Sequence, residues 1–290
     1  MNSSDHSALA PGRLFCFGLG YTGARLARVL HASGWQVSGT SRDADVLREL
    51  GAEGISGTSL EDAVIQPGTS HVLCTIPPGD AGDPVILSHA KNIFAVEGLV
   101  WMGYLSTTGV YGDRGGDTVD ESDPPAPGNT RSRHRLAAEQ TWLEFGRARG
   151  VPAHIFRLAG IYGPGRNVLD SVRAGTAKRI DKPGHRFSRI HVDDIVQTLV
   201  ASMAKPRAGA IYNVCDDEAA PPQDVIAHAA KLLGLVPPPE IPFDRAELSP
   251  MAASFYRDNK RTRNDRIKGE LGVQLRYPDY RAGLAALLEG

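Results

Sequence analysis

The chain has 290 residues, with 32 lysines and arginines against 33 aspartates and glutamates and a formal net charge of -1. This balance argues against a nucleic-acid or anionic-membrane surface, because such proteins usually carry a pronounced basic excess. The 3 cysteines lack metal-ligand or disulfide spacing, so we predict no metal and a reducing compartment. The first residues lack the features of a signal peptide, and we expect residues 1–12 to be a disordered tail of a cytoplasmic protein.

A glycine-rich turn follows the first predicted strand. Apolar residues 14–17 run into Gly18, Gly20 and Gly23 in the pattern G-x-G-x-x-G, and an amphipathic helix follows. The first glycine allows a tight turn, the second lets the backbone approach a pyrophosphate, and the third lets the helix pack closely on the strand. Free amides at the start of the helix favour an anion. We therefore expect a nicotinamide or flavin nucleotide at this turn, which also includes Tyr21 and Thr22.

Strands and helices alternate beyond this turn. The predicted strands are residues 35–40, 53–55, 71–75 and 99–106, and helices are predicted from residue 43 and over residues 90–97. This alternation is typical of an α/β fold, a doubly wound parallel sheet of the Rossmann type with helices on both faces. Ligands of such sheets bind at the carboxyl ends of the strands. We expect further cofactor contacts there from Thr75, Ile76, Pro77 and Ser106.

The pattern becomes less regular in the second half. Residues 112–129 form a long Gly-, Asp- and Pro-rich loop, which is typical of a functional segment. A helix over residues 131–149 and a strand over residues 153–158 follow, and further helices are predicted at residues 192–203, 221–233, 262–271 and 279–288. We expect a dinucleotide-binding domain at residues 13–165 and a smaller, mostly helical substrate lobe at residues 166–290, with residues 189–217 folding back onto the first domain.

The end of the second strand indicates which nucleotide binds. NAD-specific folds place an acidic residue there, about 20 positions beyond the glycines, to hold the ribose hydroxyls. Here Thr40, Ser41 and Arg42 offer two hydroxyls and a positive fork, and no carboxylate precedes Asp43. These groups suit a 2′-phosphate, so we expect NADP, with NAD as the alternative. The other interpretation of Arg42 is an arginine that caps a solvated loop.

Four later segments, together with the glycine turn, resemble one superfamily. They are STTGVYG at residues 106–112, FRLAGIYGPG at residues 156–165, RIHVDDI at residues 189–195 and IYNVCDD at residues 211–217. In this order they resemble the extended short-chain dehydrogenase/reductase superfamily, which includes nucleotide-sugar epimerases, dehydratases and reductases. The resemblance covers nearly the whole chain. It implies that the fifth strand ends in a Ser or Thr that hydrogen-bonds the substrate, and Thr107 matches that position.

The resemblance breaks at the catalytic helix. The superfamily carries Tyr-x-x-x-Lys, in which the tyrosine transfers a proton while the lysine lowers its pKa and holds the nicotinamide ribose. Aligning residues 136–139 with the superfamily places Arg131 at the tyrosine position and Arg135 at the lysine position. Arginine stays protonated and cannot act as the acid and base, although Arg135 can hold a ribose or phosphate. The chain therefore resembles the atypical branch of the superfamily, which keeps the nucleotide site and loses the usual catalytic pair. The alternative interpretation of these arginines is a solvated basic helix face, in which Glu139 pairs with Arg135.

Tyr111 and Tyr162 are the candidates for a relocated acid, because both lie in loops that approach the substrate in the superfamily. Packing or substrate contact is the alternative for each tyrosine. The resemblance also implies an arginine for a substrate diphosphate, for which Arg186 is our choice, with a loop arginine that points to water as the alternative. Arg131 can stabilise an anion. His191 of the HVDD element is a further candidate for substrate binding, with a structural role as the alternative.

Two functions follow from these observations. One is an NADP-dependent oxidoreductase or epimerase that acts on a nucleotide sugar or a similar polar, anionic carbonyl compound. The other is a catalytically silent NADP-binding sensor or regulatory protein, which would explain the arginines directly. Many extended members dimerise through the catalytic helix and its neighbour, so we also expect a homodimer. Trp142 and Phe145 on this helix suit a core equally well, which leaves the oligomeric state open.

Overall fold

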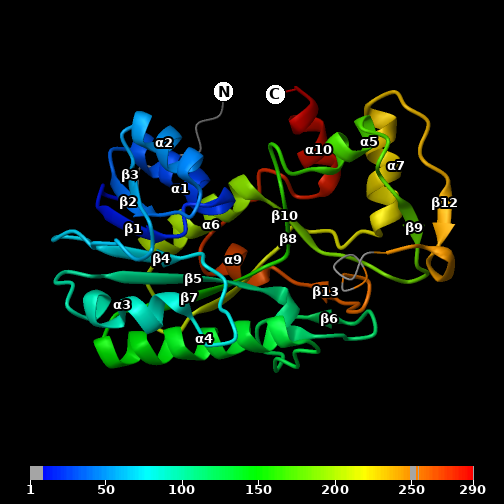
Figure 1. The fold of residues 1–290 in the computed structure, drawn as a ribbon. Helices are drawn as coiled ribbons and strands as arrows, with labels where there is room; N and C mark the ends of the chain where they lie inside the picture. Colours follow the sequence, from blue (N-terminus) through cyan, green and yellow to red (C-terminus); the bar gives the residue numbers. More distant parts are fainter. Residues whose placement is uncertain (1–8, 249–252, 254, 290) are drawn as a thin grey trace.

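A seven-stranded parallel sheet forms the centre of the computed structural model, which describes residues 9–248, 253 and 255–289. Its strand order is β11-β7-β5-β4-β1-β2-β3 (Figure 1). The strands are β1 (Arg13–Phe17), β2 (Gln36–Thr40), β3 (Ser56–Thr58), β4 (His71–Cys74), β5 (Trp101–Thr107), β7 (Ala153–Leu158) and β11 (Ile211–Val214). The strand order reverses between β1 and β4, the kind of switch point at which doubly wound sheets bind ligands. The predicted fold class is confirmed.

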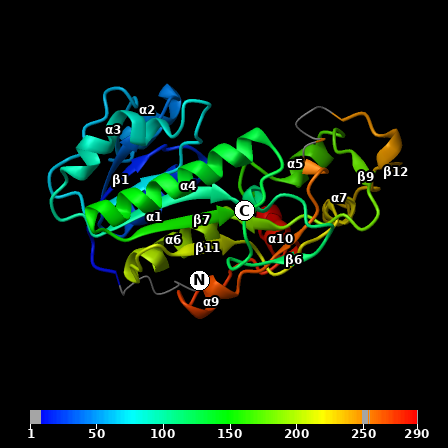
Figure 2. The same cartoon turned by 90° about the horizontal axis from the view of Figure 1, so that it is seen from below.

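Helices cover both faces of this sheet (Figures 1 and 2). One face carries α1 (Tyr21–Ala32), α2 (Ala44–Ala52) and α6 (Val192–Ala204), and the other carries α3 (Pro84–Phe94) and α4 (Thr130–Arg149). Because α6 packs against α1 and β11 pairs with β7, residues 192–214 belong structurally to the sheet layer. Trp142 of α4 is fully buried, and Phe145 packs against the same core cluster.

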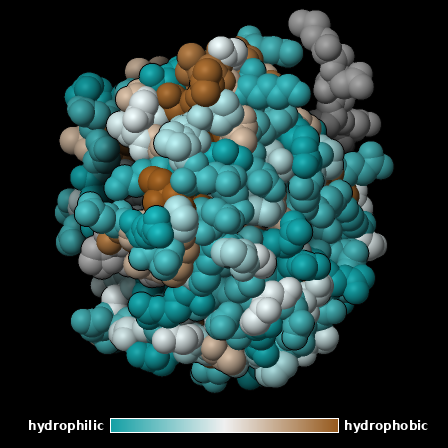
Figure 3. All heavy atoms as spheres, turned by 90° about the vertical axis from the view of Figure 1, so that its right-hand side faces the viewer, coloured by the Kyte–Doolittle hydropathy of each residue, from teal (hydrophilic) through white to brown (hydrophobic). Residues whose placement is uncertain are grey.

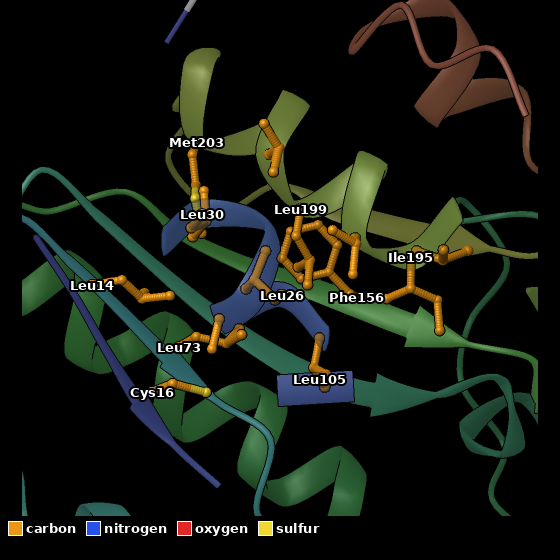
Figure 4. Packing of buried hydrophobic residues seen from close by; sticks show 14 of the residues in the cluster. Leu14, Cys16, Leu26, Leu30, Leu73, Leu105, Phe156, Ile195, Leu199 and Met203 are labelled. Atoms are coloured by element: carbon orange, nitrogen blue, oxygen red, sulfur yellow. The ribbon is translucent and has the colours of Figure 1, made fainter. Parts of the chain in front are cut away.

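Apolar side chains from α1 and α6 fill the space above the sheet. Figure 4 shows Leu26 and Leu30 of α1 and Leu199 and Met203 of α6 gathered over strand residues such as Leu73. All five are at most 2% exposed. Fully burying a side chain of this size contributes about 1.5 to 3 kcal/mol. This layer therefore fixes the position of α1, whose first turn follows the glycines.

Several element boundaries differ from the predictions. Helix α3 begins at Pro84 rather than residue 90, because Asp83 caps it by accepting from the backbone amides of Val85 and Ile86. The third strand occupies Ser56–Thr58 rather than residues 53–55, where Gly54, at φ +86°, ends the preceding helix. The helix predicted at residues 262–271 is shortened to α9 (Asp265–Gly269).

A smaller lobe lies beyond the carboxyl ends of the strands, on the right in Figure 1. Its elements are β8 (Gly160–Tyr162), α5 (Val168–Arg173), β9 (Arg179–Asp181), β10 (Arg189–His191), α7 (Pro222–Leu232), β12 (Glu240–Pro242), η2 (Phe243–Arg245) and α10 (Tyr280–Glu289). Leu169, Val225 and Leu284 are among its core residues. The face of the molecule at this end is mostly hydrophilic (Figure 3). A 3-10 turn, η1 (Thr108–Tyr111), follows β5, and the short strands β6 (Thr118–Val119) and β13 (Arg261–Thr262) pair with each other.

The predicted tail lies partly outside the described residues. Among residues 9–12, Ala10 and Pro11 are exposed, whereas Leu9 contacts the core and the Gly12 carbonyl accepts from the Gln36 amide at 3.1 Å. The prediction of a disordered tail is therefore wrong for Leu9 and Gly12. Across the described ranges, the helices are too short or too polar to cross a membrane.

Candidate cofactor and active site

The glycine turn is held between the ends of three strands. The Gly18 amide donates to Thr40 Oγ1 at 3.1 Å, and Thr75 Oγ1 donates to the Gly18 carbonyl at 2.7 Å. Gly18 has φ +103°, and a Cβ there would lie 2.3 Å from Thr75 Oγ1. A Cβ at Gly23 would lie 2.2 Å from the Gly18 carbonyl oxygen. Glycine is required at both positions, for the reasons that the sequence predicts.

The start of α1 faces open space. A Cβ at Gly20 would meet no atom within 4 Å, and this residue caps the helix without a side-chain hydrogen bond. In the described part of the chain, the backbone amides of Tyr21 and Thr22 donate to no acceptor, and the first turn contains no acidic residue. Unpaired amides and the positive end of the helix dipole favour an anion such as a pyrophosphate. A dinucleotide fits this turn.

At the end of β2, Thr40 shapes the glycine turn, and Arg42 faces solvent. Thr40 is 1% exposed and its hydroxyl accepts from the Gly18 amide, so this side chain holds the glycine turn, and its contact with a 2′-phosphate stays a prediction. Ser41 Oγ accepts from the Asp43 amide at 3.2 Å. Arg42 is exposed and forms no ion pair with any described residue. Asp43 caps α2 through the amides of Asp45 and Val46.

The residues predicted to contact the cofactor after β4 and at the end of β5 differ in their exposure to solvent. Thr75 and Ile76 are half-buried and Pro77 is exposed, so the segment after β4 borders the glycine turn. Ser106 is 5% exposed, and its hydroxyl donates to Glu139 inside the protein. The Ser106 hydroxyl thus has a partner inside the protein, and its contact with the cofactor stays a prediction.

Helix α4 begins beside the end of β5 and contains neither tyrosine nor lysine. Arg131 is exposed, whereas Arg135 is half-buried and donates to the Leu105 carbonyl at 2.6 Å and to the Tyr104 hydroxyl at 3.2 Å. Glu139 does not pair with Arg135, contrary to the alternative interpretation of this helix. It pairs instead with Arg157 of β7, Nη2 of which lies 2.8 Å from Glu139 Oε2.

The hydroxyls of Thr107 and Ser132 both lie beside Gly109, in the turn after β5. The Thr107 hydroxyl accepts from the Gly109 amide at 3.1 Å. A Cβ at Gly109 would lie 3.3 Å from Thr107 Oγ1 and 3.0 Å from Ser132 Oγ. Ser132 was missed in the sequence analysis, although it directly follows Arg131. Its hydroxyl is a second polar group beside Thr107.

A buried polar network joins β5, α4, β7 and β11. Arg157 Nη2 donates to Glu139 Oε2 at 2.8 Å, and its Nη1 donates to the Tyr111 hydroxyl at 2.9 Å. The Tyr111 hydroxyl in turn donates to Asn213 Oδ1 at 2.8 Å, and Tyr111 is 0% exposed. Burial raises the pKa of this hydroxyl, although Arg157 opposes the effect. Tyr111 is thus placed to pack rather than to exchange a proton with a ligand.

Tyr162 and His191 contact each other at the junction of the two lobes. Their ring centroids are 5.2 Å apart, and they are 8% and 1% exposed. Burial and the carboxylates of Asp216 and Asp194 raise the pKa of Tyr162 far above its ordinary value, which disfavours it as an acid. His191 caps α6 by accepting from the Asp193 amide, and burial lowers its pKa to about 4. The capping contact with the Asp193 amide gives His191 a structural role.

Arg186, the residue proposed for a substrate diphosphate, lies in the small lobe near Arg189. Arg186 is half-buried and donates to the Ala219 carbonyl at 3.3 Å. Arg189 donates to the carbonyls of Phe187 and Ala220 at 2.8 and 3.1 Å, close to the buried Asp216. Burial raises the pKa of Asp216 to about 8, against the opposing effect of Arg189. Arg131 is exposed, and no hydrogen bond or ion pair among the described residues joins it to Arg186 or His191.

The fold and the glycine turn define a doubly wound, Rossmann-type protein with a dinucleotide-binding turn at its switch point. Comparison with known families agrees with this class, because residues 92–215 match the NAD dependent epimerase/dehydratase family. The chain is therefore similar to this family over residues 92–215, and it shares its overall fold with solved epimerases and dehydratases.

Similar proteins extend over nearly the whole chain. A conserved protein of unknown function from Silicibacter pomeroyi DSS is 51% identical, with a TM-score of 0.89 over 96% of this chain and 98% of that chain. Protein YeeZ of Escherichia coli (strain K12) is 29% identical over 90% of this chain and 95% of its own length. A dTDP-glucose 4,6-dehydratase from Bacillus anthracis str. Ames, in complex with NAD, has a TM-score of 0.77 at 15% identity. The similarity covers 97% of this chain and 96% of that chain. This last similarity shows the shared fold.

Proposed function

We propose that this protein binds NADP(H) at the turn between β1 and α1 and acts as an oxidoreductase or epimerase on a polar carbonyl compound such as a nucleotide sugar. The observation that carries the proposal is the glycine turn at the switch point of the sheet, with open space at Gly20 and unpaired amides at Tyr21 and Thr22. Structural relatives that were solved with NAD support a nicotinamide cofactor at this place in the fold.

The groups after β2 favour NADP over NAD. Arg42 is exposed and has no carboxylate partner among the described residues. Asp43, the first carboxylate after the strand, is occupied as the cap of α2 and is directed to the amides of Asp45 and Val46. A guanidinium binds a phosphate with two parallel hydrogen bonds, whereas an NAD-specific site needs a free carboxylate. NAD remains the alternative cofactor.

A bound nicotinamide would supply or accept the hydride. We assign the substrate's carbonyl oxygen to the hydroxyls of Thr107 and Ser132, which lie together at Gly109. When the carbonyl carbon gains a hydride, its oxygen must gain a proton, and these hydroxyls can pass one from solvent. Arg135, directed to the end of β5, would hold the nicotinamide ribose or a phosphate. Since arginine stays protonated, neither Arg131 nor Arg135 takes part in proton transfer.

Turnover with a panel of nucleotide sugars and other polar carbonyl compounds, followed by NADPH absorbance, tests the proposal. Thr107→Val should lower turnover by about 10- to 1,000-fold, because positioned hydroxyl groups contribute factors of this size. Thr141→Val is the matched control: its hydroxyl donates to the Ala137 carbonyl within α4, and its turnover should be unchanged. Full turnover in Thr107→Val would exclude the assigned role of Thr107.

A catalytically silent NADP sensor is the second candidate function. The absence of tyrosine and lysine from α4 and the burial of Tyr111 and Tyr162 favour it. This function requires NADP(H) binding with a conformational or partner-binding response and no nicotinamide oxidation with any carbonyl compound. Cofactor-dependent turnover in the panel would exclude it.

A further inference from the structure

The loop between β8 and α5, residues 163–166, lies against the start of α1. The Tyr21 hydroxyl donates to the Pro164 carbonyl at 3.0 Å, across 143 residues of sequence. Gly163 and Arg166 exchange two backbone hydrogen bonds of 3.0 Å, which makes the loop a tight turn. Gly163 has φ +155°, and a Cβ there would lie 2.6 Å from the Tyr21 hydroxyl. Glycine therefore permits this close approach to the first residue of the helix.

This loop places an unneutralised cation beside the glycine turn. Arg166 is exposed, and its guanidinium carbon lies 5.7 Å from the centre of the Tyr21 ring. Arg25, on the next turn of α1, is bound to both carboxylate oxygens of Asp193 at 2.7 and 3.1 Å. Arg166 forms no such pair within the described ranges. Of these two arginines near Tyr21, Arg166 is the one whose charge can serve a ligand.

We propose that Arg166 binds the pyrophosphate of the dinucleotide, with the Tyr21 ring as the surface along which its side chain is held. This inference rests on the proposed cofactor site. The amides at the start of α1 can bind one side of the pyrophosphate, and its remaining oxygens need further donors. A guanidinium supplies such donors in a planar fork. Stacking over a tyrosine ring keeps the side chain near the helix terminus when no ligand is bound.

The same contact would link the cofactor to the small lobe. Residues 163–166 lead directly into Asn167, which caps α5. A pyrophosphate held by both α1 and Arg166 therefore joins the glycine turn to the lobe in which the resemblance places the substrate. Arg166 acts on cofactor affinity in this scheme and has no part in proton transfer.

Calorimetric titration with three ligands tests the proposal. NADP and NAD both carry the pyrophosphate, whereas adenosine 2′-monophosphate carries the 2′-phosphate alone. Arg166→Gln should weaken the binding of NADP and of NAD by about tenfold each, which is the effect expected for the loss of one charge-assisted hydrogen bond. It should leave adenosine 2′-monophosphate unchanged. Arg42→Gln should give the complementary pattern: it should weaken the binding of NADP and of adenosine 2′-monophosphate and leave the affinity for NAD unchanged.

Matched variants separate a ligand contact from a structural role. Arg166→Lys should restore part of the affinity, since the charge is kept and the fork is lost. Arg147→Gln removes the same charge from the exposed end of α4, and its affinities should equal those of the wild type. The ligand-free Arg166→Gln protein should melt at the wild-type temperature.

Wild-type affinity for NADP and NAD in Arg166→Gln would overturn this inference and leave the proposed function standing. Equal weakening of all three ligands, together with a lower melting temperature, would show that Arg166 is structural and would also overturn it. Failure of the wild-type protein to bind either dinucleotide would overturn the proposed function, and the inference with it.

Discussion

The buried ion pair between Glu139 and Arg157 allows a quantitative test of how α4 is held on the sheet. The two side chains are 2% and 3% exposed, and Arg157 Nη2 lies 2.8 Å from Glu139 Oε2. Removing one partner leaves the other charge buried without compensation, which costs about 3 to 5 kcal/mol. Glu139→Leu and Arg157→Met should each lower the free energy of unfolding by about that amount. The double variant should lose far less than the sum, because neither charge is left.

Urea unfolding of the wild type, the two single variants and the double variant gives the coupling free energy. We expect a coupling of at least about 2 kcal/mol, because each single loss contains the same cost of one stranded charge. The pair Arg28–Glu53 is the control, since its side chains are 40% and 41% exposed and its bond of 2.7 Å lies in solvent. Its coupling should stay below about 1 kcal/mol. Additive losses at Glu139 and Arg157 would refute this interpretation.

Three further predictions concern stability and specificity. The folded-state pKa of Asp216, about 8, lies above its ordinary value of 3.8. The neutral carboxyl group therefore stabilises the folded state fully below about pH 4, and this stabilisation is lost as the pH rises to 8. Asp216→Asn should therefore lose less stability than the wild type between pH 5 and pH 9 in urea unfolding, and equal losses would contradict the assigned burial. Gly23→Ala should lower the free energy of unfolding by about 1 to 3 kcal/mol, because its Cβ would lie 2.2 Å from the Gly18 carbonyl oxygen; unchanged unfolding would show that α1 can move away. Arg42→Gln should lower the preference for NADPH over NADH by about tenfold in paired titrations, and an unchanged preference would show that Arg42 faces only solvent.

Local patterns were sufficient to predict the sheet and the glycine turn. Apolar runs separated by amphipathic helices predict a parallel sheet, and the glycine spacing predicts the turn, because both depend on neighbouring residues. The start of α3 could have been predicted in the same way, because Asp83 followed by Pro84 is a local signal for the start of a helix. The sequence analysis overlooked this signal. The short strand β3, whose residues are Ser, Gly and Thr, gave no apolar signal.

The polar network of the site depends on tertiary packing. Glu139 has Arg135 as a neighbour four residues earlier on the helix, yet it pairs with Arg157 on β7. Tyr111 lies in a glycine-rich loop sequence, and its burial follows from contacts with Arg157 and Asn213, which are 46 and 102 residues away. Such pairings require the spatial arrangement of the strands, so residue spacing could not identify them.

Binding of NADPH by the wild type and by Gly20→Val tests the central claim most directly. Nothing lies within 4 Å of a Cβ at Gly20, and its φ of -85° suits any residue, so the variant should melt within a few degrees of the wild type. The added side chain would occupy the space where a pyrophosphate approaches the backbone. We predict that calorimetry detects NADPH binding by the wild type and a loss of at least about 100-fold in the variant, equivalent to about 2.7 kcal/mol. Equal affinity in the two proteins, or no binding by either, would contradict the assignment of a dinucleotide to this turn.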